Sequence, residues 1–184
     1  DQSVSIPLCV DLDGTLIKSN LLIEGILRTL RHRPLLAWKL PLWASRGMAH
    51  LKGQLARELA PPASPAPINR EIEAWLLEEK AKGRRVILAT SSHRDAMGPI
   101  QSLFEFDEIL ASDDDCNLTG DARARLLVER FGEKGFDFAG DPSSEKEVWK
   151  HARKVIPVSH SHRRLAAMAS EYDVERSFCT NFTS

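Results

Sequence analysis

The feature that most constrains this chain is the motif Asp-Leu-Asp-Gly-Thr, Asp11–Thr15, directly behind the short apolar run Ile6–Val10. An apolar run of this length predicts a buried strand, so the two carboxylates stand at its carboxyl end. Because they are two residues apart, they lie on the same side of an extended chain. Gly14 and Thr15 add backbone N–H groups at the same place. The motif therefore predicts a site for a metal ion and a phosphoryl group.

The remainder of the chain alternates between strand and helix patterns. Strands are predicted at 84–90, 108–111, 136–139, 154–158 and 174–179, and helices at 69–82, 94–104, 121–131, 145–152 and 163–171. This alternation predicts a parallel sheet covered on both faces, with reactive groups at the carboxyl ends of the strands. Thr90 and Asp141 each follow such a strand, so we expect both to lie near Asp11.

A helical insertion is expected after the first strand. Residues 20–59 show helical periodicity interrupted by Pro34, Pro41 and Gly47, and a proline-rich loop follows at 61–67. We therefore predict a core domain of residues 1–18 and 84–184 and a helical cap of residues 19–83. The cap is rich in arginine and lysine, which would steer an anionic substrate, and its leucines and tryptophans suit contact with a lipid or membrane surface. Ordinary packing between cap and core is the alternative.

Composition narrows the class of protein. The 184 residues carry a formal net charge of −1, so nothing global indicates nucleic acid as a partner. The three cysteines have no C-x-x-C spacing and read as reduced, which favours a cytoplasmic setting. No apolar run is long enough to span a bilayer. The chain begins at Asp1 rather than Met, which is the pattern expected of a segment from a longer protein that carries membrane spans elsewhere.

Three motifs together give a resemblance to a known family. They are D-x-D-G-T at 11–15, an apolar strand ending at Thr90, and G-D-x-x-x-E at 140–145. The chain resembles phosphohydrolases of the haloacid dehalogenase (HAD) superfamily, of the phosphoserine-phosphatase-like type. This resemblance implies a three-layer α/β, Rossmann-like parallel sheet with a helical cap, and Mg²⁺-dependent hydrolysis of a small phosphate monoester. It also implies that Asp11 attacks phosphorus to form an aspartyl-phosphate, while Asp13 protonates the leaving group and then activates water.

The resemblance assigns further site residues. Thr90 and Gly14 would bind phosphate, together with the N–H groups of Ser91 and Ser92 at the start of the next helix. The implied Mg²⁺ ligands are Asp11, Asp13 through its backbone carbonyl, Asp141 and Glu145. For Glu145 the alternative is a purely structural role at the N-terminus of its helix.

The chain departs from the family pattern at one position. The family places a lysine upstream of the acidic G-D motif, but residues 117–130 contain none. Arg123 is the best-placed cation, Arg125 is second, and Lys134 lies close to the acidic motif. Arginine is bulkier and forked, so the exchange is not conservative at a tight site. A weakly catalytic or non-catalytic HAD-like domain that binds a phosphorylated ligand is therefore the alternative function.

A narrower resemblance links the chain to the HAD domain that precedes bacterial UbiA-type membrane prenyltransferases. It rests on Arg-Pro-Leu-Leu at 33–36, Leu-Ala-Thr-Ser-Ser at 88–92 and Gly-Phe-Asp-Phe-Ala-Gly-Asp at 135–141. It implies a prenyl-phosphate or sugar-phosphate substrate, or service to a membrane prenyltransferase, at the cytoplasmic face of a membrane.

Overall fold

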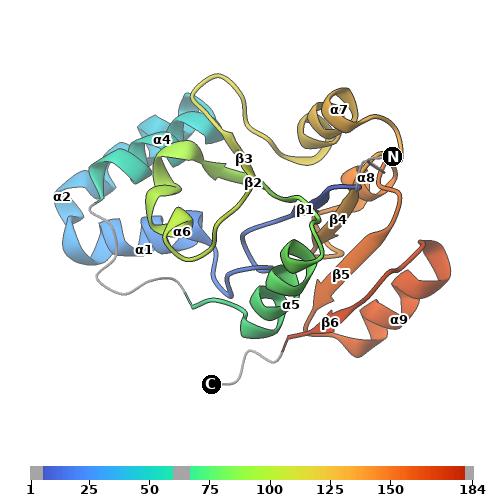
Figure 1. The fold of residues 1–184 in the computed structure, drawn as a ribbon. Coiled ribbons are helices and arrows are strands. Elements are labelled where there is room, and N and C mark those ends of the chain that lie inside the picture. The colour runs from blue at the N-terminus through green and yellow to red at the C-terminus, as the bar shows by residue number, and fades with distance from the viewer. Residues whose placement is uncertain (1–5, 60–66, 181–184) are drawn as a thin grey trace.

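A parallel sheet forms the centre of the molecule. The structure is a computed structural model that describes residues 6–59 and 67–180, so most of the proline-rich loop predicted at 61–67 lies outside the described residues. Within these residues the sheet has six strands in the order β3-β2-β1-β4-β5-β6 (Figure 1). They are β1 Leu8–Val10, β2 Val86–His93, β3 Glu108–Ser112, β4 Asp137–Gly140, β5 Val155–Ser159 and β6 Phe178–Cys179. The predicted parallel α/β sheet is confirmed.

The central strand β1 lies between β2 and β4. Val10 is in register with Leu88 on one side and with Ala139 on the other. From β1 the chain first builds the sheet outward through β2 and β3, and then returns to add β4 on the opposite side. Such a reversal opens a crevice at the carboxyl ends of the central strands, where ligands bind in open α/β sheets. Asp11 follows β1 at this crevice.

Helices cover both faces of the sheet. Leu8 and Val10 of β1 pack with Trp75 of α5 (Arg70–Ala81) and with α6 (Gly98–Gln101). Cys9 points to the opposite face, where Leu127 of α7 (Gly120–Phe131) and α8 (Lys146–Trp149) pack, together with α9 (His162–Glu171). The side chains of a strand alternate between faces, so three residues of β1 anchor both helical layers.

The segment after β1 forms a separate layer of helices beside the sheet. Its elements are α1 Leu21–His32, α2 Pro34–Ala37, α3 Lys39–Ser45 and α4 Met48–Glu58. Trp43, Leu51 and Leu55 form its own small apolar cluster. The predicted run of short helices is confirmed.

The position of α5 bears on the boundary of this cap. Ile72, Trp75 and Leu76 of α5 belong to the apolar cluster beneath the sheet, rather than to the cluster of α1–α4. We therefore propose that the cap comprises residues 19–59 and that α5 belongs to the core, which gives a shorter cap than the predicted 19–83.

The predicted end of β2 and the helix predicted after it are both wrong. The strand expected to end at Thr90 continues to His93, because His93 pairs with Ser112 of β3 after an irregularity in the ladder. The helix predicted at 94–104 is instead a short 3₁₀ helix, η1 (Arg94–Ala96), followed by the four-residue α6. Ser91 and Ser92 are consequently strand residues and do not begin a helix.

No helix in the described segments combines the length and the apolar character that crossing a bilayer requires.

Candidate active site

Asp11 is held at the crevice by its backbone and by one ion pair. Its N–H donates to the carbonyl of Ala139 at 2.9 Å, which ties the end of β1 to β4. Its Oδ1 accepts a hydrogen bond from Nη1 of Arg123 at 2.7 Å. Burial raises the pKa of Asp11 to about 7; the Arg123 guanidinium opposes this rise and the Glu145 carboxylate adds to it. Asp11 is thus a buried carboxylate whose charge depends on Arg123.

Arg123 lies in the first turn of α7 and is only 3% exposed. Besides Asp11, its guanidinium donates to Oε1 of Glu145 at 2.6 Å and to the carbonyl of Ala89, within β2, at 3.0 Å. Burial by itself would lower the pKa of Arg123, but the two carboxylates outweigh burial and hold the pKa above its usual value. A single cation therefore joins the residue after β1, the residue before α8 and the backbone of β2.

The other candidate cations lie away from Asp11. Arg125 is exposed on α7, directly after the buried residues Arg123 and Ala124. Lys134 donates to the carbonyls of Lys150 and Ala152, at 2.8 and 3.0 Å. The structure thus brings Arg123 to the predicted nucleophile and leaves the two runners-up elsewhere.

Both carboxylate oxygens of Asp13 are occupied by hydrogen bonds. Oδ1 accepts from the N–H of Leu21, the first residue of α1, at 2.7 Å, and Oδ2 accepts from the Ser92 hydroxyl at 2.6 Å. Burial raises the pKa of Asp13, although the hydrogen bond from Ser92 opposes the rise. The two hydrogen bonds fix the orientation of the Asp13 carboxyl group.

Gly14 shapes the turn that follows. Its φ of +76° lies in the left-handed region that favours glycine. Its N–H donates to the carbonyl of Ser19 at 3.2 Å, so in this structure it closes the loop. The predicted phosphate contact of Gly14 stays a prediction.

The end of β2 differs from the predicted phosphate cradle. Thr90 is fully buried and its hydroxyl accepts from the N–H of Ser92 at 3.0 Å. The carbonyl of Ser91 accepts from the Ser112 hydroxyl at 2.8 Å. Because the strand continues here, the N–H groups of Ser91 and Ser92 are not presented by a helix N-terminus, and that part of the prediction is wrong. Ser92 reaches the site through its hydroxyl instead.

A second cation enters from the cap. Nζ of Lys52, on α4, donates to the carbonyl of Ser91 at 2.6 Å and to Oδ1 of Asn117 at 3.0 Å. Burial lowers the pKa of Lys52, whereas the charge of Asp13 favours its protonated form. Sequence reasoning placed Lys52 among the basic residues of the cap, but no spacing distinguishes it from the others there. Its role in the site is evident only once α4 is docked.

The acidic motif after β4 supplies Glu145 and Asp141. Glu145 is 1% exposed, and besides Arg123 its Oε1 accepts from the Ser144 hydroxyl at 3.0 Å. A Cβ added at Gly140 would lie 2.6 Å from Cγ of Glu145, so glycine is required for this close packing. Asp141 is partly exposed and its Oδ1 accepts from the N–H of Ser143 at 2.7 Å. Burial raises the pKa of Glu145, and the nearby Asp141 charge adds to the rise.

The donors around Asp11 suit a hard cation. Oε2 of Glu145 is buried without a hydrogen-bond partner among the described residues, and buried carboxylate oxygens rarely lack a partner. Carboxylate and carbonyl oxygens are the ligands that Mg²⁺ prefers. No group of three or more His, Cys, Asp or Glu side chains in the described parts of the chain is arranged to hold a metal ion. The predicted Mg²⁺ ligands Asp11, Asp13 through its backbone carbonyl, Asp141 and Glu145 therefore stay a prediction.

Comparisons with known proteins agree with this geometry. The sequence profile of the haloacid dehalogenase-like hydrolase family matches residues 8–135. The chain is 31% identical over 155 residues to the uncharacterized protein y4nM of Sinorhizobium fredii (strain NBRC 101917 / NGR234), an alignment that covers 83% of this chain. The chain spans 30% of that relative's length.

Solved structures share the fold. A protein of unknown function from Bordetella pertussis Tohama I has a TM-score of 0.69 at 14% identity, over 97% of this chain and 100% of that one. Phosphoserine phosphatase in its apo form has a TM-score of 0.58 at 14% identity, over 96% and 94%. A phosphoserine phosphohydrolase-like protein from Francisella tularensis subsp. tularensis SCHU S4 has a TM-score of 0.61 at 16% identity, over 95% of each chain. The predicted three-layer HAD fold is confirmed.

The raised pKa of Asp11 predicts how stability depends on pH. Its folded value of about 7 lies above its ordinary value of 3.8, so between these values the folded state binds more protons than the unfolded state. The free energy of unfolding should therefore fall as pH rises from about 4 to about 7, by ~2–4 kcal/mol. Asp11→Asn should flatten this dependence, because the titrating carboxyl group is removed. Arg123 then still has Glu145 as its ion-pair partner.

Urea denaturation at pH 5 and pH 7.5, with a chelator present, measures this effect. Asp115→Asn is the control, because Asp115 is exposed on the loop after β3. If the free energy of unfolding fell equally between pH 5 and pH 7.5 in the wild type and in Asp11→Asn, the pH dependence could not be assigned to Asp11.

Proposed function

The chain belongs to the haloacid dehalogenase-like hydrolase family, and on that premise we propose that it is a Mg²⁺-dependent phosphatase that hydrolyses a small phosphate monoester through an aspartyl-phosphate on Asp11. One observation carries the proposal. The crevice holds a buried carboxylate, Asp11, beside a buried cation, Arg123, while a second carboxylate with a raised pKa, Asp13, lies close by.

The first step is attack on phosphorus by Asp11. Arg123 holds Oδ1, so Oδ2 is the oxygen proposed to form the bond to phosphorus while the bond from phosphorus to the leaving oxygen breaks. Asp13 gives its proton to that leaving oxygen, and the neutral alcohol departs. The hydrogen bonds from Leu21 and Ser92 hold the Asp13 carboxyl in one orientation for this transfer.

The second step is hydrolysis of the aspartyl-phosphate. Asp13, now ionised, takes a proton from water, whose oxygen attacks phosphorus and releases inorganic phosphate and the Asp11 carboxylate. The cations Arg123 and Lys52 stabilise negative charge that develops on the phosphoryl oxygens. When bound, Mg²⁺ would neutralise phosphate charge and lower the repulsion between the two anions. Asp11, Asp141 and the Asp13 carbonyl are the proposed ligands.

The alternative is a weakly catalytic or non-catalytic domain that binds a phosphorylated ligand. The position of Arg123 speaks for the enzyme, because its guanidinium directly contacts Asp11, the proposed nucleophile. The forked guanidinium is nevertheless larger than an ammonium group, so its effect on the rate needs a direct test.

The first prediction concerns the nucleophile. Asp11→Asn should reduce Mg²⁺-dependent release of phosphate from aryl, alkyl and sugar phosphates by at least about 10³-fold, because an amide oxygen cannot serve as the attacking carboxylate. Colorimetric phosphate assays with and without a chelator measure this, with Asp115→Asn as the matched control. Retention of activity in Asp11→Asn would exclude the aspartyl-phosphate route. A folded wild type that is inactive on every ester would favour the non-catalytic alternative.

The second prediction concerns the cation. Arg123→Lys should preserve or raise the phosphatase rate, and Arg123→Ala should lower it by roughly 10²–10³-fold, because a buried charge that stabilises the reacting groups is lost. Single-turnover rates compare the two variants with Arg125→Ala, an exposed position on the same helix. Equal rates in all of them would mean that another group supplies the positive charge.

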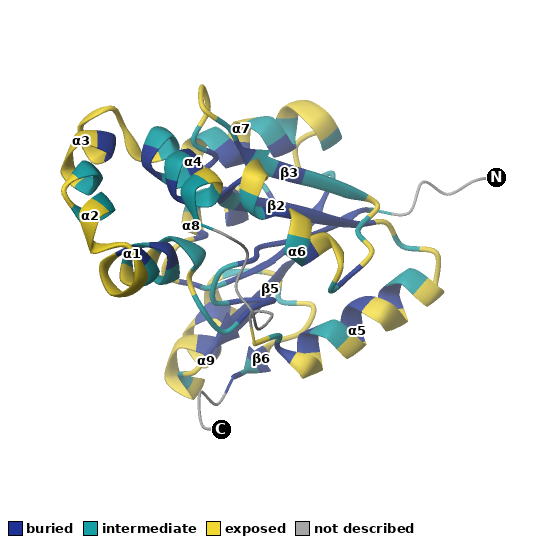
Figure 2. Ribbon diagram, turned by 90° about the vertical axis from the view of Figure 1, so that its left-hand side faces the viewer, coloured by how far each residue is buried: buried dark blue, intermediate teal, exposed yellow. Residues whose placement is uncertain are grey.

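We also propose that the outer face of the cap contacts an anionic membrane surface. Ile23, Leu27 and Leu30 share one face of α1 and are each more than half exposed, and Leu35 and Trp38 continue this apolar surface at 86% and 67% exposure. Figure 2 shows exposed residues along α1, α2 and α3. The same helices carry a net excess of arginine and lysine. Apolar side chains among cations are the pattern of helices that lie in an anionic lipid interface.

Vesicle sedimentation tests this contact. The wild type should bind vesicles that contain phosphatidylserine and bind those of phosphatidylcholine alone at least about tenfold more weakly, and salt should weaken the binding. Leu27→Glu with Leu35→Glu should reduce binding, whereas Leu77→Glu, at an exposed position on α5, should not. Equal binding of the cap and control variants would show that the membrane is not the partner of this face.

A further inference from the structure

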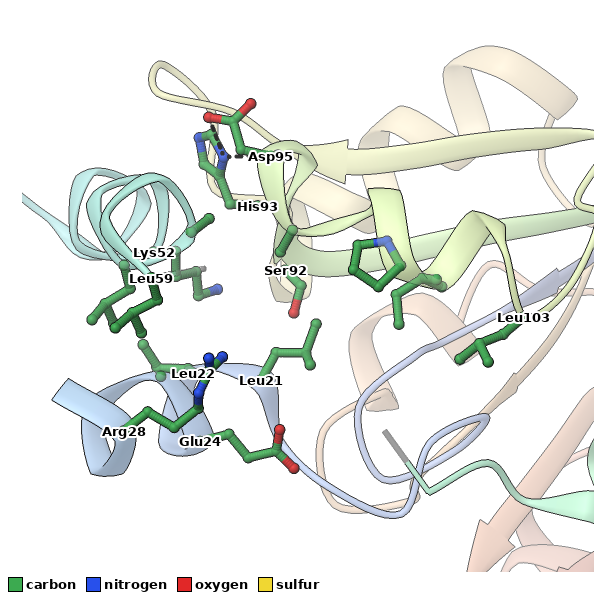
Figure 3. A pocket seen from close by; sticks show the side chains of 16 residues that line it. Leu21, Leu22, Glu24, Arg28, Lys52, Leu59, Ser92, His93, Asp95 and Leu103 are labelled. Carbon is green, nitrogen blue, oxygen red and sulfur yellow. Dashed lines mark hydrogen bonds and ion pairs between the residues drawn. The ribbon is translucent and has the colours of Figure 1, made fainter. Parts of the chain in front are cut away.

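An apolar pocket lies between the cap and the core, next to the catalytic crevice. Its volume is about 130 Å³. The cap side is formed by α1 and α4, and the core side by the end of β2, η1 and the residues around α6 (Figure 3). The larger apolar side chains in its wall are Leu21, Leu22, Leu55, Leu59, Ile100 and Leu103.

The pocket lies beside the residues that orient the proposed general acid. Two of its lining residues, Leu21 and Ser92, are the two hydrogen-bond donors to the Asp13 carboxylate, at 2.7 and 2.6 Å. In the proposed reaction Asp13 protonates the oxygen of the leaving group. The carbon atoms attached to that oxygen would then extend past Leu21 and Ser92 into this pocket, and its walls would select the leaving group.

The polar groups of the pocket are unevenly distributed. Lys52 extends from α4 on the side where Ser92 lies (Figure 3). Its Nζ donates a hydrogen bond to the carbonyl of Ser91 on β2. Asp95 at the far wall forms an ion pair with Arg57 at 2.7 Å, which joins α4 to η1. Glu24 and Arg28 line the α1 wall. His93 lines the wall between Ser92 and Asp95, and leucine, isoleucine, proline, alanine and glycine residues form the rest of the wall.

The volume sets the size of the group that fits. An apolar cavity of about 150 Å³ accommodates one benzene molecule. The pocket of this chain is slightly smaller, so it matches a single ring or a branched or linear chain of about five or six carbons. A larger hydrocarbon would have its remaining carbons in the open mouth.

We propose that the substrate is a phosphate monoester of an apolar alcohol, with the first five or six carbons of the alcohol seated between α1, α4 and α6. The inference rests on the proposed phosphatase function, because it uses Asp13 to locate the leaving group. Burial of each further methylene group should improve recognition until the pocket is full.

The experiment compares kcat/KM for methyl, propyl, pentyl, hexyl and octyl phosphate with that for O-phosphoserine and glycerol phosphate. From methyl to pentyl we expect an increase of about fourfold per methylene, the equivalent of ~0.8 kcal/mol, and little further increase beyond hexyl. A flat series, or preference for the polar esters through Glu24 and Arg28, would overturn the inference and leave the phosphatase function standing.

Variants of the wall test the location. Leu22→Gln and Leu103→Gln should each reduce the ratio of pentyl to methyl phosphate turnover, while Leu77→Gln on the exposed face of α5 should not change it. Ala96→Leu should move the preferred chain length to a shorter alcohol, because the added carbons occupy the pocket. Circular dichroism confirms that each variant is folded. An unchanged ratio in every wall variant would place the leaving group elsewhere.

Calorimetric binding of the same esters to Asp11→Asn separates the two proposals. Affinity for Asp11→Asn that rises with chain length would support the pocket, and absence of phosphate release from every ester by the folded wild type would then overturn the phosphatase function alone. Affinity that is independent of chain length, in Asp11→Asn and in turnover by the wild type, would overturn the pocket.

Discussion

The ion pairs of Arg123 are the interaction on which the candidate site depends. Its guanidinium, 3% exposed, binds Asp11 after β1, Glu145 before α8 and the backbone carbonyl of Ala89 within β2. Removal of one partner from a buried ion pair typically costs ~3–5 kcal/mol, so these elements are held together at the crevice. The same arrangement leaves two buried carboxylates with one cation. Burial raises the pKa of Asp11, and the neighbouring Glu145 charge adds to the rise.

The cap and the core complete each other through Asp13. One of its oxygens is held by the N–H of Leu21 at the start of α1, and the other by Ser92 on β2. Lys52 extends from α4 to the same region and binds the backbone of β2. Cap and core thus both orient Asp13, the general acid of the proposed reaction. In that proposal, an apolar pocket at their interface would select the alcohol without contacting the nucleophile.

Much of the fold was predictable, because apolar residues recur at different spacings in strands and in helices. The parallel sheet and the short helices of the cap were expected from these patterns. Arg123 was one of three candidate cations, and it was considered only because the chain resembles the HAD family. The prediction for Ser91 and Ser92 was wrong, because an apolar run followed by small polar residues does not reveal that pairing with β3 extends the strand to His93. The contacts of Lys52 could not be found, because they depend on how α4 docks.

By itself the sequence determined the order of the elements and the residues that carry chemistry. The D-x-D-G-T motif places two carboxylates after a buried strand through local geometry alone, and the acidic motif after β4 follows the same logic. Only the tertiary structure decided which cation reaches Asp11, which donors orient Asp13 and where an apolar pocket forms. Those contacts join residues far apart in the chain, since Arg123 follows Asp11 by 112 positions, and they arise from the packing of side chains between separate layers.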